Sequence, residues 1–257
     1  MNDFEIRPKP VNRRIVVDAG HLAHNRHIIH GLVEADITQA RSLLREQSEH
    51  LGTRLSFTAF MAASYARAVA AMPRVQTYLN WRGQQIIFHN VDVATLIEPA
   101  EGRVAIPHIL RNANAKSVKE LTDEIRAVQE KPRSSAQARG IIALAPYIPR
   151  FLRLLYFWVL KKNPLWFKKA AGTTVLTSIG MFGKGGGWGI AFLSTHTLGL
   201  TVGGITEKPA VHDGKIEVGE FIQLTLSFDH DVVDGAPAAR FTGQFIEMLE
   251  AGSVLQD

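Results

Sequence analysis

The residues best placed to do chemistry lie near the C-terminal end, where positions 227–235 read SFDHDVVDG. The apolar run at 221–228 predicts a buried strand, and residues 236–249 predict a helix. A histidine at the end of a rigid strand, with a carboxylate four residues later, is suited to act as an oriented base. His230 and Asp234 are therefore the first catalytic candidates. Taken alone, the pattern equally describes a structural histidine beside an Asp-Gly turn.

Composition excludes several classes of function. The chain has 257 residues, of which 46% are hydrophobic and 21% charged, and it contains no cysteine. Disulfides, a cysteine nucleophile and thiolate metal sites are therefore excluded. The formal charge of +5 comes from dispersed basic residues, which argues against nucleic-acid binding and suits small anionic partners such as the phosphates of coenzyme A. Residues 1–14 are polar and do not resemble a secretory signal, so we expect a cytoplasmic protein.

Hydrophobic periodicity predicts alternating helices and strands around the candidate site. Ser117 and Glu120 form a capping-box pattern at the start of one helix. We expect a single domain over residues 1–257, because no repeat or Pro/Ser-rich linker interrupts it. The predicted class is α/β, a mixed sheet with helices on one face. The expected helices are 13–25, 36–51, 57–72 and 117–129, and the expected strands are 28–37, 84–88, 91–97, 104–110, 173–179 and 198–205, with a hairpin at 210–218.

Residues 141–169 form an aromatic segment with basic residues toward its end. Positions 141–160 are long enough to span a bilayer, but two prolines and two arginines lie within them. We therefore expect an amphipathic helical pair rather than a transmembrane span. Such a pair would pack within the assembly, cover a substrate channel or lie on a membrane surface, and we favour packing over membrane contact.

Three ordered stretches resemble the catalytic domain of the dihydrolipoyl acyltransferase components of 2-oxo-acid dehydrogenase complexes. Residues 227–236, SFDHDVVDGA, resemble the family pattern S-x-D-H-R-x-x-D-G-A. Residues 176–183, LTSIGMFG, resemble T-I-S-N-L-G-M-F-G. Residues 104–113, VAIPHILRNA, followed by Lys116-Ser117, resemble V-V-P-V-I-R-N-A-x-x-K-S. The likeness runs from about 11 to 250, apart from an aromatic helical insertion at about 135–170.

The resemblance implies a chloramphenicol-acetyltransferase-like fold assembled as a homotrimer, with active sites at subunit interfaces. It also implies transfer of an acyl group between coenzyme A and a dihydrolipoyl thiol in a ternary complex. His230 matches the family's catalytic base. Thr177 matches the hydroxyl that stabilises the oxyanion, with Ser178 as the near alternative. Asp234 is expected to fix the histidine's surroundings through a salt link, and Gly235 to permit the tight exit from the strand.

Departures from the family pattern qualify what the resemblance implies. Asp231 replaces the arginine that follows the histidine, which is expected to alter either the basicity of His230 or an intersubunit contact. We find no lipoyl domain and no peripheral-subunit-binding domain, so a lipoyl group would come from a separate protein. The polar C-terminal residues favour an isolated trimer over a larger cage. No metal is expected.

Other functions remain open at this stage. A chloramphenicol-type O-acetyltransferase would use His230 on a small hydroxyl acceptor, and a trimeric scaffold would keep the fold without the chemistry. Peptide condensation domains need a second histidine where Asp229 stands. The glycine-rich residues 184–188 lack the context of a phosphate-binding loop, so we interpret them as a mobile loop near the channel.

Overall fold

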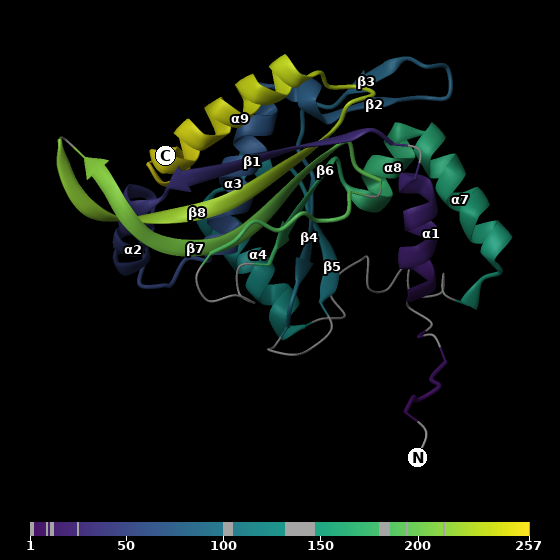
Figure 1. Cartoon of the computed structure of the whole chain (residues 1–257), viewed down its shortest axis with the longest axis horizontal. Helices are drawn as coiled ribbons and strands as arrows, with labels where there is room; N and C mark the ends of the chain where they lie inside the picture. Colours follow the sequence, from purple (N-terminus) through teal and green to yellow (C-terminus); the bar gives the residue numbers. More distant parts are fainter. Residues whose placement is uncertain are drawn as a thin grey trace.

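A computed structural model describes residues 3–8, 10, 13–24, 26–99, 105–131, 147–179, 186–193, 195–212 and 214–256 (Figure 1). Six strands form one sheet in the order β1-β8-β7-β6-β4-β5. Their bounds are β1 Ile28–Asp36, β4 Val93–Ile97, β5 Ile106–Leu110, β6 Thr174–Ser178, β7 Leu198–His212 and β8 Lys215–Asp229. Strand β6 runs parallel to β4 and β7, and the other neighbours are antiparallel, so the expected mixed sheet is confirmed.

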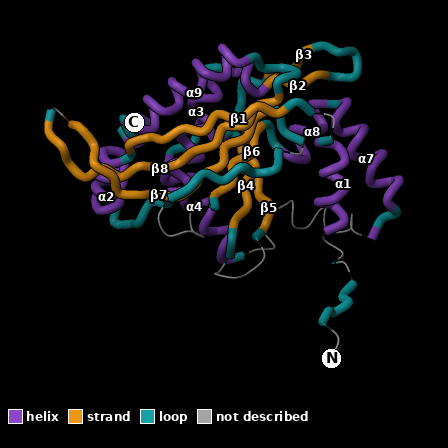
Figure 2. Tube along the Cα trace, viewed as in Figure 1, coloured by secondary structure: helices purple, strands orange, loops and turns teal. Residues whose placement is uncertain are grey.

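The helices supply the partner layer of the core. Their bounds are α1 Arg13–Ala23, α2 Thr38–His50, α3 Phe57–Ala71, α4 Val118–Glu130, α7 Arg150–Lys162, α8 Pro164–Ala171 and α9 Gly235–Glu250. One face of the sheet is apolar and packs against α2, α3, α4 and α9 (Figure 2). Helix α3 is buried along nearly its whole length, as its alanine-rich, all-round apolar sequence predicts. The sheet and these helices thus enclose the main core, and a smaller cluster of Tyr78, Phe88, Leu160 and Phe167 lies apart from it.

Local sequence signals set several helix ends. The expected capping box is present at α4: the Ser117 hydroxyl accepts from the Glu120 backbone N–H, and the Glu120 carboxylate accepts from the Ser117 backbone N–H. At α3 the Ser56 hydroxyl accepts from the Ala59 backbone N–H. These contacts satisfy donors that a helix leaves unpaired at its N-terminus.

The region around residues 77–97 differs from the expectation. The strands predicted at 84–88 and 91–97 belong to different sheets. Strand β3, Gln85–Ile87, pairs with a short strand β2, Thr77–Leu79, and forms a separate two-stranded sheet. Sequence periodicity misses β2 because three residues are too few to show an alternating pattern.

Strands β7 and β8 are longer than expected. The predicted strands 198–205 and 221–228 and the predicted hairpin at 210–218 merge into two paired strands of 15 residues each. Their shared tip projects from the molecule at the opposite end from α7 (Figure 1). Three parts of the predicted features lie outside the described residues: position 213 of the turn, residues 180–183 of the motif at 176–183, and position 104 of the motif at 104–113.

The described part of the insertion forms two helices, α7 and α8, joined at Asn163. Helix α7 packs against α1 and against α8. The Asn163 side chain caps α8 by accepting from the Trp166 backbone N–H, and Pro164 occupies the first turn, where no backbone donor is needed. Within the described ranges, no helix has the length and apolar character needed to cross a membrane.

Candidate active site

The turn after β8 holds His230 at the surface on a fixed backbone. The His230 backbone N–H donates to the His27 carbonyl at 2.7 Å. The carbonyl of Asp229 accepts from the backbone N–H groups of Val232 and Val233, which closes the turn. The residue stays exposed while its main chain is held from both sides. An accessible imidazole on a rigid support is what a general base requires.

Asp229, the residue before the histidine, is buried beneath this turn. Its carboxylate lies 3.4 Å from the Arg26 guanidinium, and both side chains are almost fully buried. The same carboxylate accepts from the Asp231 backbone N–H at 3.2 Å. Burial raises the pKa of Asp229, although Arg26 acts in the opposite direction. Because an unpaired buried charge is costly, this ion pair ties the segment before β1 to the end of β8.

Asp231, which replaces the family's arginine, makes its contact inside the chain. Its carboxylate lies 2.8 Å from the Nδ1 atom of His27, within hydrogen-bond distance. The hydrogen bond and the negative charge of Asp231 raise the pKa of His27. The charge that departs from the family pattern is therefore directed at His27, the same residue whose carbonyl anchors the backbone of His230.

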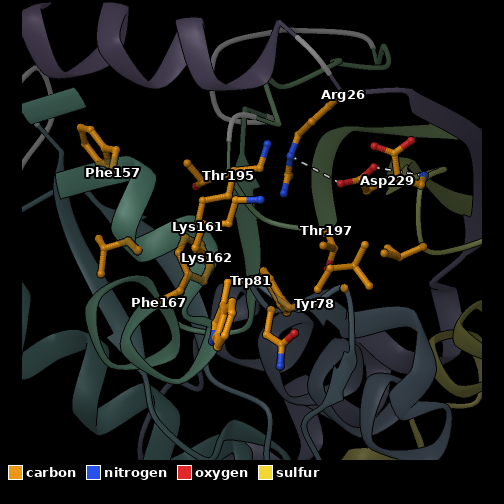
Figure 3. A pocket seen from close by; sticks show the side chains of 16 residues that line it. Arg26, Tyr78, Trp81, Phe157, Lys161, Lys162, Phe167, Thr195, Thr197 and Asp229 are labelled. Carbon is orange, nitrogen blue, oxygen red and sulfur yellow. Dashed lines mark hydrogen bonds and ion pairs between the residues drawn. The ribbon is translucent and has the colours of Figure 1, made fainter. Parts of the chain in front are cut away.

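A cavity of about 450 Å³ opens beside this turn (Figure 3). It is enclosed by the turn after β8, the β2–β3 hairpin and helices α7 and α8 of the insertion, together with Arg26 before β1 and the segment before β7 at Thr195 and Thr197. The volume lies within the usual range for small-molecule sites. The walls combine aromatic rings with charged groups, namely Tyr78, Trp81, Phe157 and Phe167 with Arg26, Lys161, Lys162, Asp229 and Asp231. His230 is not among the lining residues.

The cavity wall carries three cations, Arg26, Lys161 and Lys162, and two carboxylates, Asp229 and Asp231. Lys161 carries a lowered pKa, first because it is partly buried and then because Arg26 is nearby. Tyr78 is fully buried, which raises the pKa of its hydroxyl, and that hydroxyl donates to the Thr173 carbonyl at 2.8 Å. A bound anionic group would offset the repulsion between Lys161 and Arg26.

Thr177 and Ser178 lie elsewhere on the sheet, at the end of β6. Thr177 lines a smaller hollow of about 250 Å³ on the sheet face opposite the helices, together with Phe192 and Ser227. Because side chains alternate along a strand, Ser178 points to the other face. Ser178 is exposed, and Thr177 is half-buried.

One chain does not bring Thr177 and His230 together. Thr177 pairs with Thr201, and Thr201 pairs with Thr225 on β8. His230 lies five residues beyond Thr225. At roughly 3.4 Å per residue along a strand and roughly 4.8 Å between strands, the two side chains are on the order of 20 Å apart. A site that uses both residues needs a second copy of the chain.

The expected salt link of Asp234 stays a prediction, because no ion pair between the described residues of one chain involves this carboxylate. Asp234 precedes α9 as its N-cap residue, is exposed, and its side chain makes no capping hydrogen bond. In the described part of the chain, the ion pair beneath the histidine is formed by Asp229 and Arg26. The two carboxylates differ in position: Asp229 ends the buried strand, whereas Asp234 begins a helix at the surface. Gly235 starts that helix, and a Cβ atom there would meet no neighbour within 4 Å.

The described part of the glycine-rich loop is bound to the sheet rather than detached from it. The Gly204 backbone N–H donates to the Gly187 carbonyl at 3.1 Å, beside a β-bulge in β7. A Cβ atom on Gly203 would lie 2.3 Å from that same carbonyl oxygen, so glycine is required for this close approach. Residues 186–188 therefore lie against the sheet, and the mobility expected of this loop stays a prediction. Positions 184 and 185 lie outside the described residues.

Sequence reasoning missed Arg26, His27, Trp81 and Lys161. Arg26 and His27 reach the turn after β8 from more than 200 positions away in sequence, and no local pattern joins them. Asp229 carried a usable signal, since it matches the aspartate of the family pattern S-x-D-H. Among the described residues, no group of three or more histidine or acidic side chains is arranged to hold a metal ion.

Comparison with known proteins decides the family. The family model described as 2-oxoacid dehydrogenases acyltransferase (catalytic domain) matches residues 13–139 and 168–255. The chain belongs to this family. The residues left unmatched, 140–167, coincide with most of the expected insertion and include all of α7.

Relatives of this acyltransferase family cover most of the chain. The dihydrolipoyllysine-residue acetyltransferase component of the Bacillus subtilis pyruvate dehydrogenase complex is 24% identical over 88% of this chain and 44% of its own length. The lipoamide acyltransferase component of the B. subtilis branched-chain alpha-keto acid dehydrogenase complex is 24% identical over 86% of this chain and 46% of its own length. The chain thus spans less than half the length of these relatives.

Solved structures of acyltransferases confirm the fold. The dihydrolipoamide acetyltransferase of Azotobacter vinelandii superposes with a TM-score of 0.72 at 21% identity, covering 98% of this chain and 95% of that one. A chloramphenicol acetyltransferase superposes with a TM-score of 0.53 at 12% identity, covering 98% of each chain. The expected chloramphenicol-acetyltransferase-like fold is therefore confirmed.

Proposed function

We propose that this chain is an acyl-CoA-dependent acyltransferase that moves an acyl group between the thiol of coenzyme A and a dihydrolipoyl-type thiol carried by another protein. The observation that carries the proposal is the placement of His230. It stands exposed, on a backbone held by His27 and by the Asp229 turn, inside the ordered motifs of the acyltransferase family.

In the proposed reaction, His230 removes the proton from the attacking thiol, which is mostly protonated at neutral pH. The thiolate adds to the thioester carbonyl and forms a tetrahedral intermediate. A hydroxyl donates to the oxyanion of that intermediate. Collapse then breaks the original carbon–sulfur bond, and the departing thiolate takes the proton back from His230. No cysteine of the chain holds the acyl group, because none is present.

The hydroxyl is assigned to Thr177, or else to Ser178, of a neighbouring copy. The Azotobacter vinelandii enzyme was studied for catalytic roles of a serine, a histidine and an asparagine. Its asparagine follows its histidine by four residues, as Asp234 follows His230. Its serine precedes the histidine by the same interval that separates Ser178 from His230, whereas the motif letters align Thr177. We favour Thr177, because it faces the surface proposed below to contact the neighbouring copy.

A homotrimer is proposed because one chain separates Thr177 from His230. The sheet face that carries Thr177 is not covered by the helical layer, and it exposes large apolar side chains in a region where a neighbouring copy would bury them. These side chains are Leu32, Leu96, Ile179, Trp188 and Phe192. The structure of a cubic pyruvate dehydrogenase core superposes with a TM-score of 0.71 at 22% identity, which shows that this fold is compatible with self-assembly.

The proposal is tested with purified protein, an acyl-CoA and dihydrolipoamide, with acyl transfer followed by the release of free coenzyme A. Replacing His230 by Ala is expected to lower turnover by about 10²–10⁴-fold, because general-base catalysis contributes roughly that much. The oligomeric mass and the circular dichroism spectrum should not change. Unchanged turnover in this variant would instead support a non-catalytic scaffold.

The cavity favours a second candidate, an O-acetyltransferase acting on a small hydroxyl acceptor. A cavity of about 450 Å³ with aromatic walls suits a free small molecule. Testing thiol and hydroxyl acceptors side by side with one acyl-CoA separates the two functions. Turnover confined to hydroxyl acceptors would replace the dihydrolipoyl assignment.

A further inference from the structure

Helix α7 presents an apolar stripe to solvent. Phe151, Leu155 and Trp158 are 68%, 54% and 54% exposed. Their spacing of four and three residues places them on one face of the helix, and Lys162 continues that face one turn later. An ordinary surface helix turns such a stripe toward the core. Here the opposite side is buried through Leu160 and Arg153, and the stripe of Phe151, Leu155 and Trp158 remains exposed.

The inward side of the same helix carries a charge. Arg153 is only 6% exposed and lies 2.6 Å from the carboxylate of Asp18 on α1. It also donates to the Ile148 carbonyl. Because this buried guanidinium is fully engaged, rotating α7 to bury the apolar stripe would break an ion pair inside the protein. The exposed stripe is therefore fixed in place by the fold.

Helix α8 extends the exposed apolar surface. Leu165 and Trp166 are 61% and 55% exposed, while Pro164 and Phe167 on the other side are buried. Lys169 follows Leu165 by one turn and is exposed. Both helices therefore combine exposed aromatic or aliphatic side chains with a lysine near the C-terminal end.

The positive charge of this surface indicates an anionic partner. Residues 147–171 contain six lysines and arginines and no aspartate or glutamate. Lys161, Lys162 and Lys169 form no ion pair with the described residues. A second copy of this surface would bring the same positive charge and repel it. Exposed tryptophan and phenylalanine flanked by lysine suit the boundary between lipid head groups and acyl chains.

We propose that α7 and α8 dock the protein onto the surface of an anionic lipid bilayer. Phe151, Leu155 and Trp158 enter the head-group boundary, and the lysines contact lipid phosphates. The described helices are too short and polar to span the bilayer, so the contact is peripheral. The docking surface is defined as Phe151, Leu155, Trp158, Lys162, Leu165, Trp166 and Lys169. It lies at one end of the long axis of the molecule (Figure 1).

Co-flotation of the full chain with vesicles tests the proposal. Binding is expected to vesicles containing phosphatidylglycerol and not to pure phosphatidylcholine vesicles. Raising the ionic strength from about 0.1 M to about 1 M should weaken it, because the screening length falls from about 10 Å to about 3 Å. Equal binding to both kinds of vesicle, or no binding to either, would overturn the proposal.

Paired variants locate the contact. Phe151→Ser with Trp158→Ser is expected to lower vesicle partitioning at least about tenfold, since it removes two large apolar groups. Lys162→Gln with Lys169→Gln should lower it about fivefold per lysine. The matched control is Val211→Ser with Ile216→Ser at the β7–β8 tip, where the side chains are 71% and 80% exposed. Equal loss in the control would show that binding is not specific to α7 and α8.

Tryptophan fluorescence reports the depth of insertion. A variant with Trp81→Phe and Trp188→Phe retains Trp158 and Trp166, and its emission should shift to the blue and be quenched by brominated lipid. The reciprocal variant, which keeps Trp81 and Trp188, should show neither effect on the same vesicles. Quenching of the reciprocal variant alone would contradict docking through α7.

The main competing occupant is a second copy of the chain. If Phe151→Ser with Trp158→Ser reduces the oligomeric mass in the absence of lipid, the stripe is a contact between copies and the docking proposal fails. The expected result is an unchanged mass with lost vesicle binding. This readout is independent of acyl transfer, so it stands or falls separately from the proposed catalytic function.

Discussion

His196 is a buried imidazole behind the cavity wall, and burial lowers its pKa from 6.5 to about 4. Its Nε2 atom lies 2.9 Å from the Ala171 carbonyl, and its ring packs edge-on against Phe167. His196 therefore takes up a proton near pH 6.5 in the unfolded chain but only near pH 4 in the folded chain. It follows that stability falls as the pH drops from about 6.5 to about 4.

The size of this effect can be measured by denaturant unfolding at several pH values. Loss of stability attributable to His196 should be on the order of 3 kcal/mol across that window. His196→Gln keeps a donor for the Ala171 carbonyl and removes the titration, so the difference in slope between the two proteins isolates the histidine. Equal slopes would show that His196 titrates normally.

Thr177 is the second residue whose role can be isolated. If its hydroxyl donates to the oxyanion, Thr177→Val should lower kcat by about 10²–10³-fold with little change in KM, because the donor acts only after the tetrahedral centre forms. The Ser178 side chain points to the other face, so Ser178→Ala should change kcat less than about threefold. The reverse pattern, measured in the same acyl-transfer assay, would assign the donor to Ser178.

The insertion helices depend on one buried ion pair, Arg153 with Asp18. Arg153→Leu leaves the Asp18 carboxylate buried without its main partner and is expected to cost roughly 3–5 kcal/mol in unfolding free energy. The double variant with Asp18→Leu removes both charges and should recover much of that loss. Thermal or denaturant unfolding of the two variants checks this. A double variant with a lower unfolding free energy than the single variant would contradict the expectation.

At the scale of the whole molecule, catalysis is proposed to need two copies of the chain. His230→Ala and Thr177→Val should each be inactive as homotrimers. When the two are refolded together in equal amounts, one interface of each mixed trimer joins an intact histidine to an intact threonine. Because about three quarters of the trimers are mixed, roughly a quarter of wild-type activity should return. If activity does not return after subunit exchange has been verified, the active site does not combine His230 of one copy with Thr177 of another.

The sequence by itself determined the fold class, most of the strands and helices, the α4 capping box and the position of His230 at the end of a buried strand. These features depend on side-chain periodicity within about 15 residues and on motifs read in chain order. They are local, so the chain displays them directly. Strand β2 was missed, because its pairing with β3 depends on neighbours outside that range. The salt link expected at Asp234 and the mobility expected of residues 184–188 stay predictions.

Only the tertiary structure decided which distant groups meet. The Arg26–Asp229 pair and the His27–Asp231 contact join positions more than 200 residues apart, and strand register alone separates Thr177 from His230. The orientation of α7 was also hidden, because its sequence carries apolar side chains on more than one side. The ion pair between buried Arg153 and Asp18 determines which side of α7 faces inward. The free energy of a buried charge depends on its three-dimensional neighbours rather than on its place in the chain.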